Sequence, residues 1–495
     1  MTNVRFLKIY REHHYRGRVE RFNVYLDNGL ESLSHKLRYL WWEGFWLESL
    51  PFNFCPEQLV ELCIPGSKLK MLWDGVQNVV NLKRIDLEGS RDLIKLPDLS
   101  KAEKLESICV CYCESLHLLH PSVSSLPKLT YLCLSYCREI KSIDVHSKSL
   151  RNLILNECSS LNELSVTSKE MTMLNLSNTP ICTLPSTISQ NKKLACLWLN
   201  GCNFIDKLSL QTLLHNIGHF SSLEFLGLEE TNIESLPTSI KSLSSLTCIE
   251  LSNCRKLVSL PELPPSLREL ELQYCTKLMS LTKFPPSLEQ VDASNCTCLE
   301  ENFTQQLVLQ HMLQSHITYL EQQYSKGYHE DYSFYLFPGE HVTKECRFHS
   351  VGSSITIPHL PLPSHICGFI YCVILPKGLF KYLIVRIVSY IYQDGEKVGF
   401  GPRFLFGKDF NSDHLMLYYE KKLDALNCNL PFKFEFSLKN GLEPHDDGIK
   451  ECGVFPVYKL ESGYKVLVSG NTKIFDMEST IQISLSQTSE QLNWS

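Results

Sequence analysis

The stretch "LESICVCYC", from Leu105 to Cys113, places three cysteines within five residues. Cysteine thiolates bind zinc and other soft metals, and pairs of cysteines form disulfides, so this spacing is compatible with a metal site or with a disulfide. A tetrahedral metal site needs a fourth ligand, and none is evident in the sequence around these cysteines. The meaning of the three thiols therefore depends on whether the stretch stands alone or belongs to a repeat.

The stretch is one copy of a repeat. Segments of the form L-x-x-L-x-L-x-x-(N/C/S/T) begin at residues 37, 59, 82, 105, 129, 150, 171, 194, 223, 246, 267 and 288, and successive starts differ by 21 to 29 residues. This period is typical of leucine-rich repeats, in which every repeat supplies one short parallel strand. "VRFLKI" at Val4 fits a degenerate further copy. The sequence therefore predicts an α/β leucine-rich-repeat solenoid, a curved parallel sheet of about 12–13 repeats over residues 1–300.

At the ninth position of each repeat the chain turns away from the strand and the side chain lies inside, where only a small residue that can form hydrogen bonds fits. Ser67, Ser90, Thr179 and Thr231 occupy it in four repeats. Seven others carry cysteine, which predicts a structural ladder of buried thiols formed by Cys113, Cys137, Cys158, Cys202, Cys254, Cys275 and Cys296.

Cys109 and Cys111 differ from the ladder cysteines, because they point outward on either side of the inward Val110. Cys133 takes the position of Cys109 one repeat later, and parallel strands lie about 4.8 Å apart, so the three thiols can cluster. Without a fourth ligand we expect reduced surface thiols and no metal site.

Outward strand positions are free to vary, since the inward ones hold the fold. Aromatic residues and arginine are favoured at binding hot spots. The outward positions also become acidic toward the last repeats, where Glu224, Glu289 and Asp292 occur as well, which favours a basic partner surface with Trp198 and Phe225 beside it. The candidate protein-binding residues are Trp41, Arg84, Tyr131, Trp198, Phe225, Glu250, Glu269 and Glu271.

Composition argues against several other functions. The net charge is -6 and no basic block occurs, so neither nucleic acid nor an anionic membrane is an expected partner. No motif with catalytic spacing appears, and no cofactor or metal is expected. The N-terminus lacks the apolar region of a signal peptide. We therefore expect a soluble protein of the cytoplasm or nucleus, with its 21 cysteines mostly reduced.

The repeat pattern ends near Leu299. Apolar residues at three- and four-residue steps predict a helical cap or linker over residues 301–328. Short β-rich runs punctuated by Pro, Gly, Asn and Asp then predict an all-β jelly-roll or Ig-like sandwich over residues 329–485, followed by a tail at 486–495. The runs are "SSITIPHLPL", "ICGFIYCVIL", "YLIVRIVSYIY", "HLMLYYE", "FKFEFSL", "KVLVSG" and "IQISL".

The order of motifs resembles one family. "NGLESLSHKLRYLWWEGFWLESLPFNF", "LVELCIPGSKLKMLWDGVQNVVNLKRIDLEGS" and "LIKLPDLSKAEKLE" are similar to the repeats of plant intracellular TIR-class disease resistance receptors. "LFPGEHV", "SVGSSITI" and "GFIYCVIL" resemble the jelly-roll/Ig-like domain (C-JID) that follows those repeats. Thr343 stands where the family usually has proline, which affects the local loop only. The resemblance covers nearly the whole chain.

This resemblance implies a recognition module that binds a pathogen effector or a guarded host protein through the concave repeat surface and the C-terminal domain. Other immune receptor chains are further expected partners. The sequence holds no G-x-x-x-x-G-K-(S/T) loop and no TIR domain, the family's NAD-cleaving part, so we expect no enzymatic activity from this chain. The alternatives are an extracellular or other leucine-rich-repeat scaffold, or an NAD hydrolase whose upstream TIR domain is missing from this chain.

Overall fold

The computed structural model describes the chain except for residues 1–2, 11–29, 31, 52, 182–183, 189–190, 203–216, 318–332, 359, 361–362, 379–384, 407–409, 422–425, 441–442, 445–447, 461–462 and 467–495. It divides into two compact units. Unit 1 comprises Met1–Thr231 and Pro237–Leu246, and unit 2 comprises Asn232–Leu236 and Thr247–Ser495. Among the described residues, no helix is long and apolar enough to cross a membrane.

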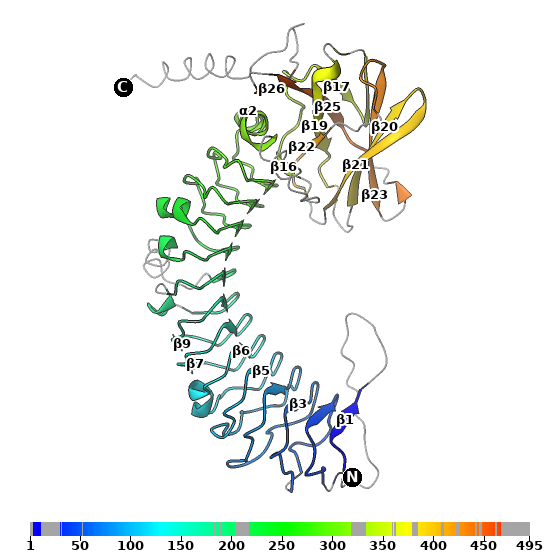
Figure 1. The fold of residues 1–495 in the computed structure, drawn as a ribbon. Coiled ribbons are helices and arrows are strands. Elements are labelled where there is room, and N and C mark those ends of the chain that lie inside the picture. The colour runs from blue at the N-terminus through cyan, green and yellow to red at the C-terminus, as the bar shows by residue number, and fades with distance from the viewer. Residues whose placement is uncertain are drawn as a thin grey trace, which may run out of the picture. The chain divides into compact units, whose positions relative to one another are not determined.

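Unit 1 is built from short parallel strands, one to a repeat (Figure 1). Each strand begins two residues after its repeat start, as the period predicts. The strands are β1 (Phe6–Ile9), β2 (Tyr39–Trp42), β3 (Glu61–Cys63), β4 (Arg84–Asp86), β5 (Ser107–Cys109), β6 (Tyr131–Cys133), β8 (Asn152–Ile154), β10 (Met173–Asn175), β11 (Cys196–Trp198) and β12 (Phe225–Gly227).

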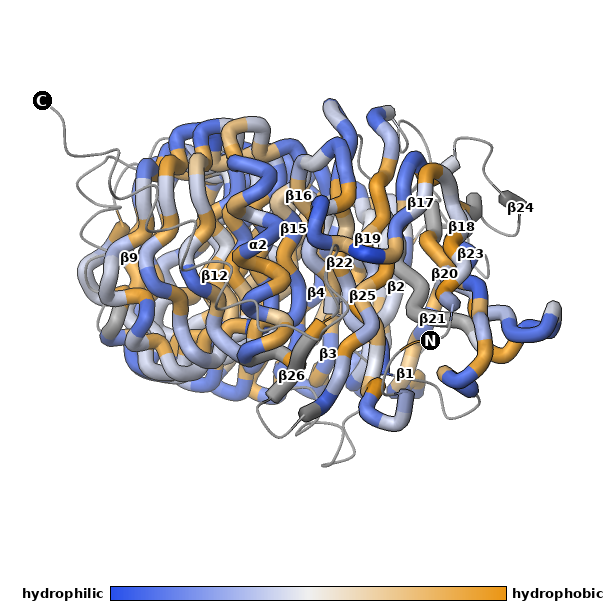
Figure 2. The backbone as a smooth tube through the Cα atoms, turned by 90° about the horizontal axis from the view of Figure 1, so that it is seen from above, coloured by the Kyte–Doolittle hydropathy of each residue, from blue (hydrophilic) through white to orange (hydrophobic). Residues whose placement is uncertain are grey.

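Alternation of side chains fixes which face of each strand is buried. The first, fourth and sixth residues of a repeat point inward, and Leu82, Ile85 and Leu87 are all fully buried. The predicted register is confirmed, since Leu40 in unit 1 and Leu270 in unit 2 are 1% and 0% exposed. Along the repeats, hydrophobic stretches of backbone alternate with hydrophilic ones (Figure 2).

The eighth residue of every repeat has a left-handed backbone. The glycines at this position, such as Gly66 and Gly89 (φ 64° and 70°), adopt it without strain, but Tyr112, Glu157 and Glu230 adopt it too (φ 58°, 63° and 58°). The conformation is required because it aims the amide toward the next repeat. The N–H of Gly89 donates to the carbonyl of Cys111, for example, at 2.7 Å.

The return segments of unit 1 use little regular structure. They contain the short 3₁₀ helices η1 (Pro121–Ser125), η3 (Ile217–His219) and η4 (Thr238–Ser242), and the parallel pair β7 (Ser142–Val145) and β9 (Glu163–Val166). Two leucines that precede prolines in these segments, Leu50 and Leu96, are buried, whereas Leu184 is half-buried. The helix expected in "LQTLLHNIGHF" lies mostly outside the described residues.

Unit 2 begins with the last repeat strands, β13 (Cys248–Glu250), β14 (Glu269–Glu271) and β15 (Gln290–Asp292). The helix α2 (Glu301–His311) follows, continued by a π turn at Met312–His316. The strand β16 (Phe334–Pro338) then pairs in parallel with β15, in the place that a further repeat would take. The sequence predicted that a helix caps the end of the parallel sheet. In the structure, the strand β16 extends the sheet there as well.

The C-terminal part of unit 2 is a β-sandwich. One sheet holds β16, β17 (Phe348–Val351), β19 (Ile366–Leu375), β22 (His414–Lys421), β25 (Glu451–Leu460) and β26 (Gly463–Val466), and the other holds β18 (Ser354–Ile357), β20 (Val385–Gln393), β21 (Glu396–Phe406), β23 (Phe432–Asn440) and β24 (Glu443–Pro444). Aromatic rings fill the space between them. Phe369 and Tyr371 of the first sheet meet Phe434 of the second with ring centroids 5.2 and 5.1 Å apart.

Six of the seven predicted runs contain a strand. "IQISL" and the predicted tail lie outside the described residues, as does most of the second half of the predicted helix at 301–328. The strands β16, β17, β21, β24 and β25 were not among the predicted runs. The exact domain boundaries stay predictions.

The "FPGEHV" loop is held by carboxylates from two other elements. Glu301 accepts hydrogen bonds from the amides of Glu340 and His341 at 2.9 and 3.3 Å, and Glu451 accepts one from the amide of Val342 at 3.0 Å. The loop therefore has a structural role in joining α2 to the sandwich.

The left-handed eighth position generates the first testable prediction. Replacing Glu230, an exposed residue with φ 58°, by glycine should raise the free energy of unfolding by about 1 kcal/mol, because glycine carries no left-handed penalty. The matched opposite change, Gly89→Ala, adds a Cβ with no contact closer than 3.8 Å and should lower it by a similar amount. Urea denaturation measures both, and equal stability of the two variants would contradict this backbone assignment.

Candidate functional site

The candidate site is the set of outward positions on the repeat strands, the second, third, fifth and seventh of each repeat. The eight residues predicted for it are all partly or fully exposed. Five of them lie in unit 1 and three in unit 2.

In unit 1 the structure brings Trp198 and Phe225 together. Their ring centroids lie 4.8 Å apart with the planes tilted by 35°, and both side chains are half-buried. Gly227 pairs with Trp198 across the two strands, and a Cβ at this glycine would come within 3.1 Å of the indole. The absence of a side chain at Gly227 thus gives the indole room over the next strand. The sequence had not identified this residue.

The other three candidates of unit 1 stand in separate repeats. Trp41 is half-buried, and the ammonium of Lys8 lies 5.4 Å from its ring centroid. The guanidinium of Arg84 donates to Asp86 at 2.8 Å, and this hydrogen bond raises the pKa of Arg84. Burial raises the pKa of the Tyr131 hydroxyl. These three candidates therefore contribute to the outward face separately and not as a joint cluster.

In unit 2 the fifth positions form a row of carboxylates. Glu250, Glu271 and Asp292 pair across neighbouring strands. The side-chain amide of Gln273 donates to Glu271 at 2.7 Å and to Asp292 at 2.6 Å. Like charges on adjacent strands repel one another, so a cationic group placed over this row would be stabilised.

The acidic surface is smaller than the sequence suggested. Glu289 was expected to point outward, but it is 4% exposed and receives two hydrogen bonds from Arg268, at 3.1 and 2.8 Å. Asp292 is 8% exposed. Both side chains are thus largely removed from solvent, with Arg268 bonded to Glu289 and Gln273 bonded to Asp292. The acidic candidates that keep exposure are Glu250, Glu269 and Glu271.

The seven ladder cysteines are buried, with at most 2% exposure. Six have an Sγ that donates to the carbonyl of the sixth residue in the preceding repeat. Cys137, for example, donates to Val110 at 3.1 Å, and Cys158 donates to Leu134 at 3.1 Å. Burial raises the pKa of Cys158 to about 12, whereas a hydrogen bond from Cys296 lowers the pKa of Cys275. All cysteines among the described residues are free thiols.

The fold and these outward rows define a leucine-rich-repeat protein with a C-terminal β-sandwich. A family model described as disease resistance protein RPS4B-like, leucine-rich repeats, matches residues 185–302. Among solved structures, a leucine-rich-repeat protein of Leptospira interrogans covers 57% of this chain and 91% of its own at 16% identity. Its TM-score of 0.28 is too low to add to the fold described above.

Three curated relatives come from Arabidopsis thaliana. Disease resistance protein RPS4B is 30% identical over 54% of this chain and 24% of its own length. Disease resistance protein RML1B is 29% identical over 96% and 43%. Disease resistance protein RPS6 is 32% identical over 53% and 22%. The predicted resemblance to plant disease resistance proteins is confirmed, and the chain spans less than half the length of these relatives.

The ladder geometry makes a testable prediction. Native protein treated with a thiol reagent should be modified at the exposed Cys298 and not at the ladder positions, because the reagent cannot reach buried thiols. Cys158→Arg should cost more than about 4 kcal/mol, since it buries an unpaired charge. Cys158→Ser is the matched control, because serine occupies this position at Ser67 and Ser90. Mass spectrometry and urea unfolding measure these effects, and rapid native labelling of Cys158 would contradict them.

Proposed function

We propose that this chain is a recognition part of a plant disease resistance receptor. It binds a protein partner, a pathogen effector or a guarded host protein, through outward residues of the repeat strands and through the β-sandwich. The observation that carries the proposal is that the two faces of each repeat strand have different roles, one in the core and one at the surface. Inward positions such as Leu197 and Leu226 are fully buried, while the neighbouring outward positions carry the Trp198–Phe225 pair.

The aromatic pair has the properties of a binding anchor. A half-buried indole and phenyl ring already in contact lose little conformational freedom when a partner covers them. Aromatic residues with this partial burial dominate the free energy of many protein interfaces. We propose Trp198 and Phe225 as the apolar anchor in unit 1.

The carboxylate row of unit 2 supports a partner with a basic surface. Glu250, Glu269 and Glu271 lie on two adjacent strands, and Cys248 beside them has its pKa raised by burial and by Glu269. A concentrated negative potential steers a cationic surface toward itself and acts mainly on the association rate.

We further propose that the chain acts by binding and not by catalysis, in the cytoplasm or nucleus. The supporting observation is the thiol ladder, whose S–H groups must stay reduced to donate their hydrogen bonds. Reduced thiols are maintained in those compartments. Signalling and any NAD cleavage would then belong to domains of the kind found in longer receptors.

The anchor is tested by truncation. Trp198→Ala should weaken binding by at least about 30-fold toward a partner selected from a library of pathogen effector proteins, because hot-spot truncations cost 2 kcal/mol or more. Leu118→Ala is the matched control, since Leu118 is an apolar side chain 53% exposed on a return segment. Calorimetry measures both affinities. Equal losses for the two variants, or none for Trp198→Ala, would reject the anchor.

The acidic row is tested by charge reversal. The double variant Glu250→Lys, Glu271→Lys should slow association about tenfold at low salt, and the difference should shrink at physiological ionic strength, where the screening length is about 8 Å. The control reverses Glu103 and Glu139, which are exposed outside the outward strand rows. Stopped-flow kinetics with a selected effector provide the measurement. A salt-independent difference, or an equal effect in the control, would contradict steering by the row.

A further inference from the structure

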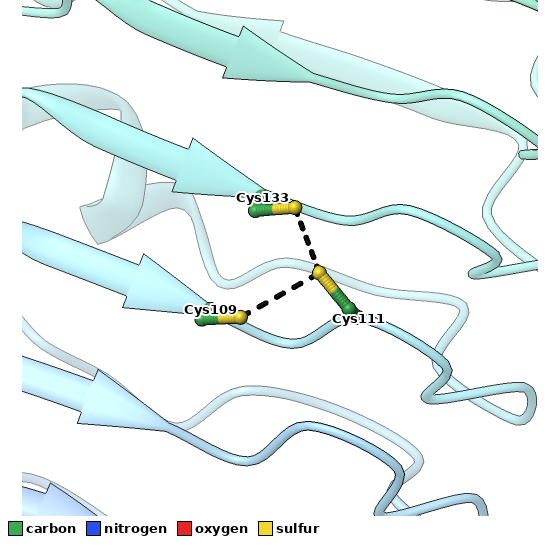
Figure 3. A group of neighbouring side chains, drawn as sticks. All are labelled: Cys109, Cys111 and Cys133. Atoms are coloured by element: carbon green, nitrogen blue, oxygen red, sulfur yellow. Dashed lines mark hydrogen bonds between the residues drawn. The ribbon is translucent and has the colours of Figure 1, made fainter. Parts of the chain in front are cut away.

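Three thiols of unit 1 meet on the outward face of β5 and β6. The Sγ of Cys111 lies between the other two, 3.5 Å from that of Cys109 and 2.7 Å from that of Cys133 (Figure 3). All three sulfur atoms lie within 4.8 Å of one another. Cys133 is 3% exposed, whereas Cys109 and Cys111 are half-buried. The cluster is therefore partly sheltered but reachable from the outward face.

The repeat register places these residues together. Cys109 and Cys133 are direct cross-strand partners at the fifth position of consecutive repeats, and Asp86 is the partner of Cys109 on the other side. Cys111 occupies the seventh position, on the same face as Cys109. Because backbone hydrogen bonds on both sides hold the three positions, the thiols are brought together without any flexible loop.

Carboxylates border the cluster. A ligand oxygen of Asp86 and one of Glu88 lie within 4.8 Å of each other and of the Cys109 sulfur. Asp86 is already engaged, because it accepts from Arg84 at 2.8 Å and from the amide of Glu88 at 3.2 Å. The Glu88 side chain is exposed, and burial and Asp86 raise its pKa. Glu88 is thus the nearby carboxylate best able to move.

The three outward thiols contact one another and a neighbouring hydroxyl. The sulfur of Cys133 shares a hydrogen bond with that of Cys111 and another with Ser135 Oγ at 3.3 Å. The ladder thiol Cys113 instead donates to the carbonyl of Leu87 in the interior. The outward thiols therefore converge on one another and not on the main chain, as the ligands of a shared metal ion do.

The spacing fits a tetrahedral metal ion. Zn–S bonds of about 2.3 Å place the sulfurs of a tetrahedral site about 3.8 Å apart. The Cys109–Cys111 separation of 3.5 Å is close to this value, whereas the Cys111–Cys133 separation of 2.7 Å must widen when an ion enters. A disulfide would need a separation of about 2.05 Å and an oxidant. Only the Cys111–Cys133 contact is short enough to suggest one.

We propose that Cys109, Cys111 and Cys133 bind one thiophilic divalent metal ion of the Zn²⁺ type, with the fourth position open to solvent beside Glu88. Binding replaces the remaining thiol protons by the metal and releases them to solvent, so affinity rises with pH. The ion would tie β5 to β6 and leave a Lewis-acidic position on the outward face, next to Tyr131.

The test uses the full chain, without a metal-binding tag and with a phosphine reductant. Co²⁺ serves as the spectroscopic probe, because tetrahedral thiolate coordination gives intense visible and charge-transfer bands. Competition with a chromogenic chelator then gives the Zn²⁺ affinity. We expect one ion per chain, and a loss of at least about 100-fold in affinity for Cys111→Ser and for Cys133→Ser. Glu88→Gln should weaken binding less than these cysteine variants.

Cys196→Ser is the matched control, because Cys196 is a half-buried outward cysteine of β11 that is not part of the cluster. It should leave the spectrum and the affinity unchanged. Three results would overturn the proposal: no thiolate bands with Co²⁺, equal losses in the control, or a Cys111–Cys133 disulfide in protein purified without oxygen. A failure to bind effectors would not affect this outcome, so the metal site and the proposed function are tested independently.

Discussion

The structure depends on one recurring interaction, the hydrogen bond from the ninth residue of a repeat to the sixth residue of the repeat before it. Cys113, Cys137 and Cys158 make it in three successive repeats, with sulfur-to-oxygen distances of 3.3, 3.1 and 3.1 Å. The thiol is small enough for the crowded interior, and it gives a second hydrogen bond to a buried carbonyl that already accepts the amide of the ninth residue of its own repeat. Because this bond joins one repeat to the next, the inward residues cannot vary independently.

The same constraint explains why function resides on the outward positions. A substitution at Leu153 or Leu197 opens a cavity in the core, whereas one at Ile154 or Trp198 changes only the face that a partner meets. The constraint also explains the end of the array. The last repeat strand, β15, would present unpaired backbone groups at the edge of the sheet, and β16 pairs with it there. The sandwich that follows β16 is thus tied to the repeats by main-chain hydrogen bonds.

The parts of the structure governed by periodicity could be predicted from the sequence. The leucine spacing predicts every repeat strand and the ladder positions, because burial fixes register strongly. Contacts made across long separations could not be predicted. Glu289 is bonded to Arg268 of the preceding repeat, and Glu88 approaches Cys109 only through the pairing of β4 and β5. The strand β21 was missed because Gly399, Gly401 and Pro402 interrupt "EKVGFGPRFLF", and both residue types are uncommon in strands.

The central claim is that a protein partner meets the outward strand positions of the repeats and the sandwich, while the return segments serve the fold. Hydroxyl-radical footprinting of the chain with and without a selected effector tests it most directly, because the method reports side-chain exposure at each residue. We expect protection of Trp198, Phe225 and Tyr131 on the outward face, and no change at Leu118 or Met279 on return segments. Protection confined to the return segments would contradict the account.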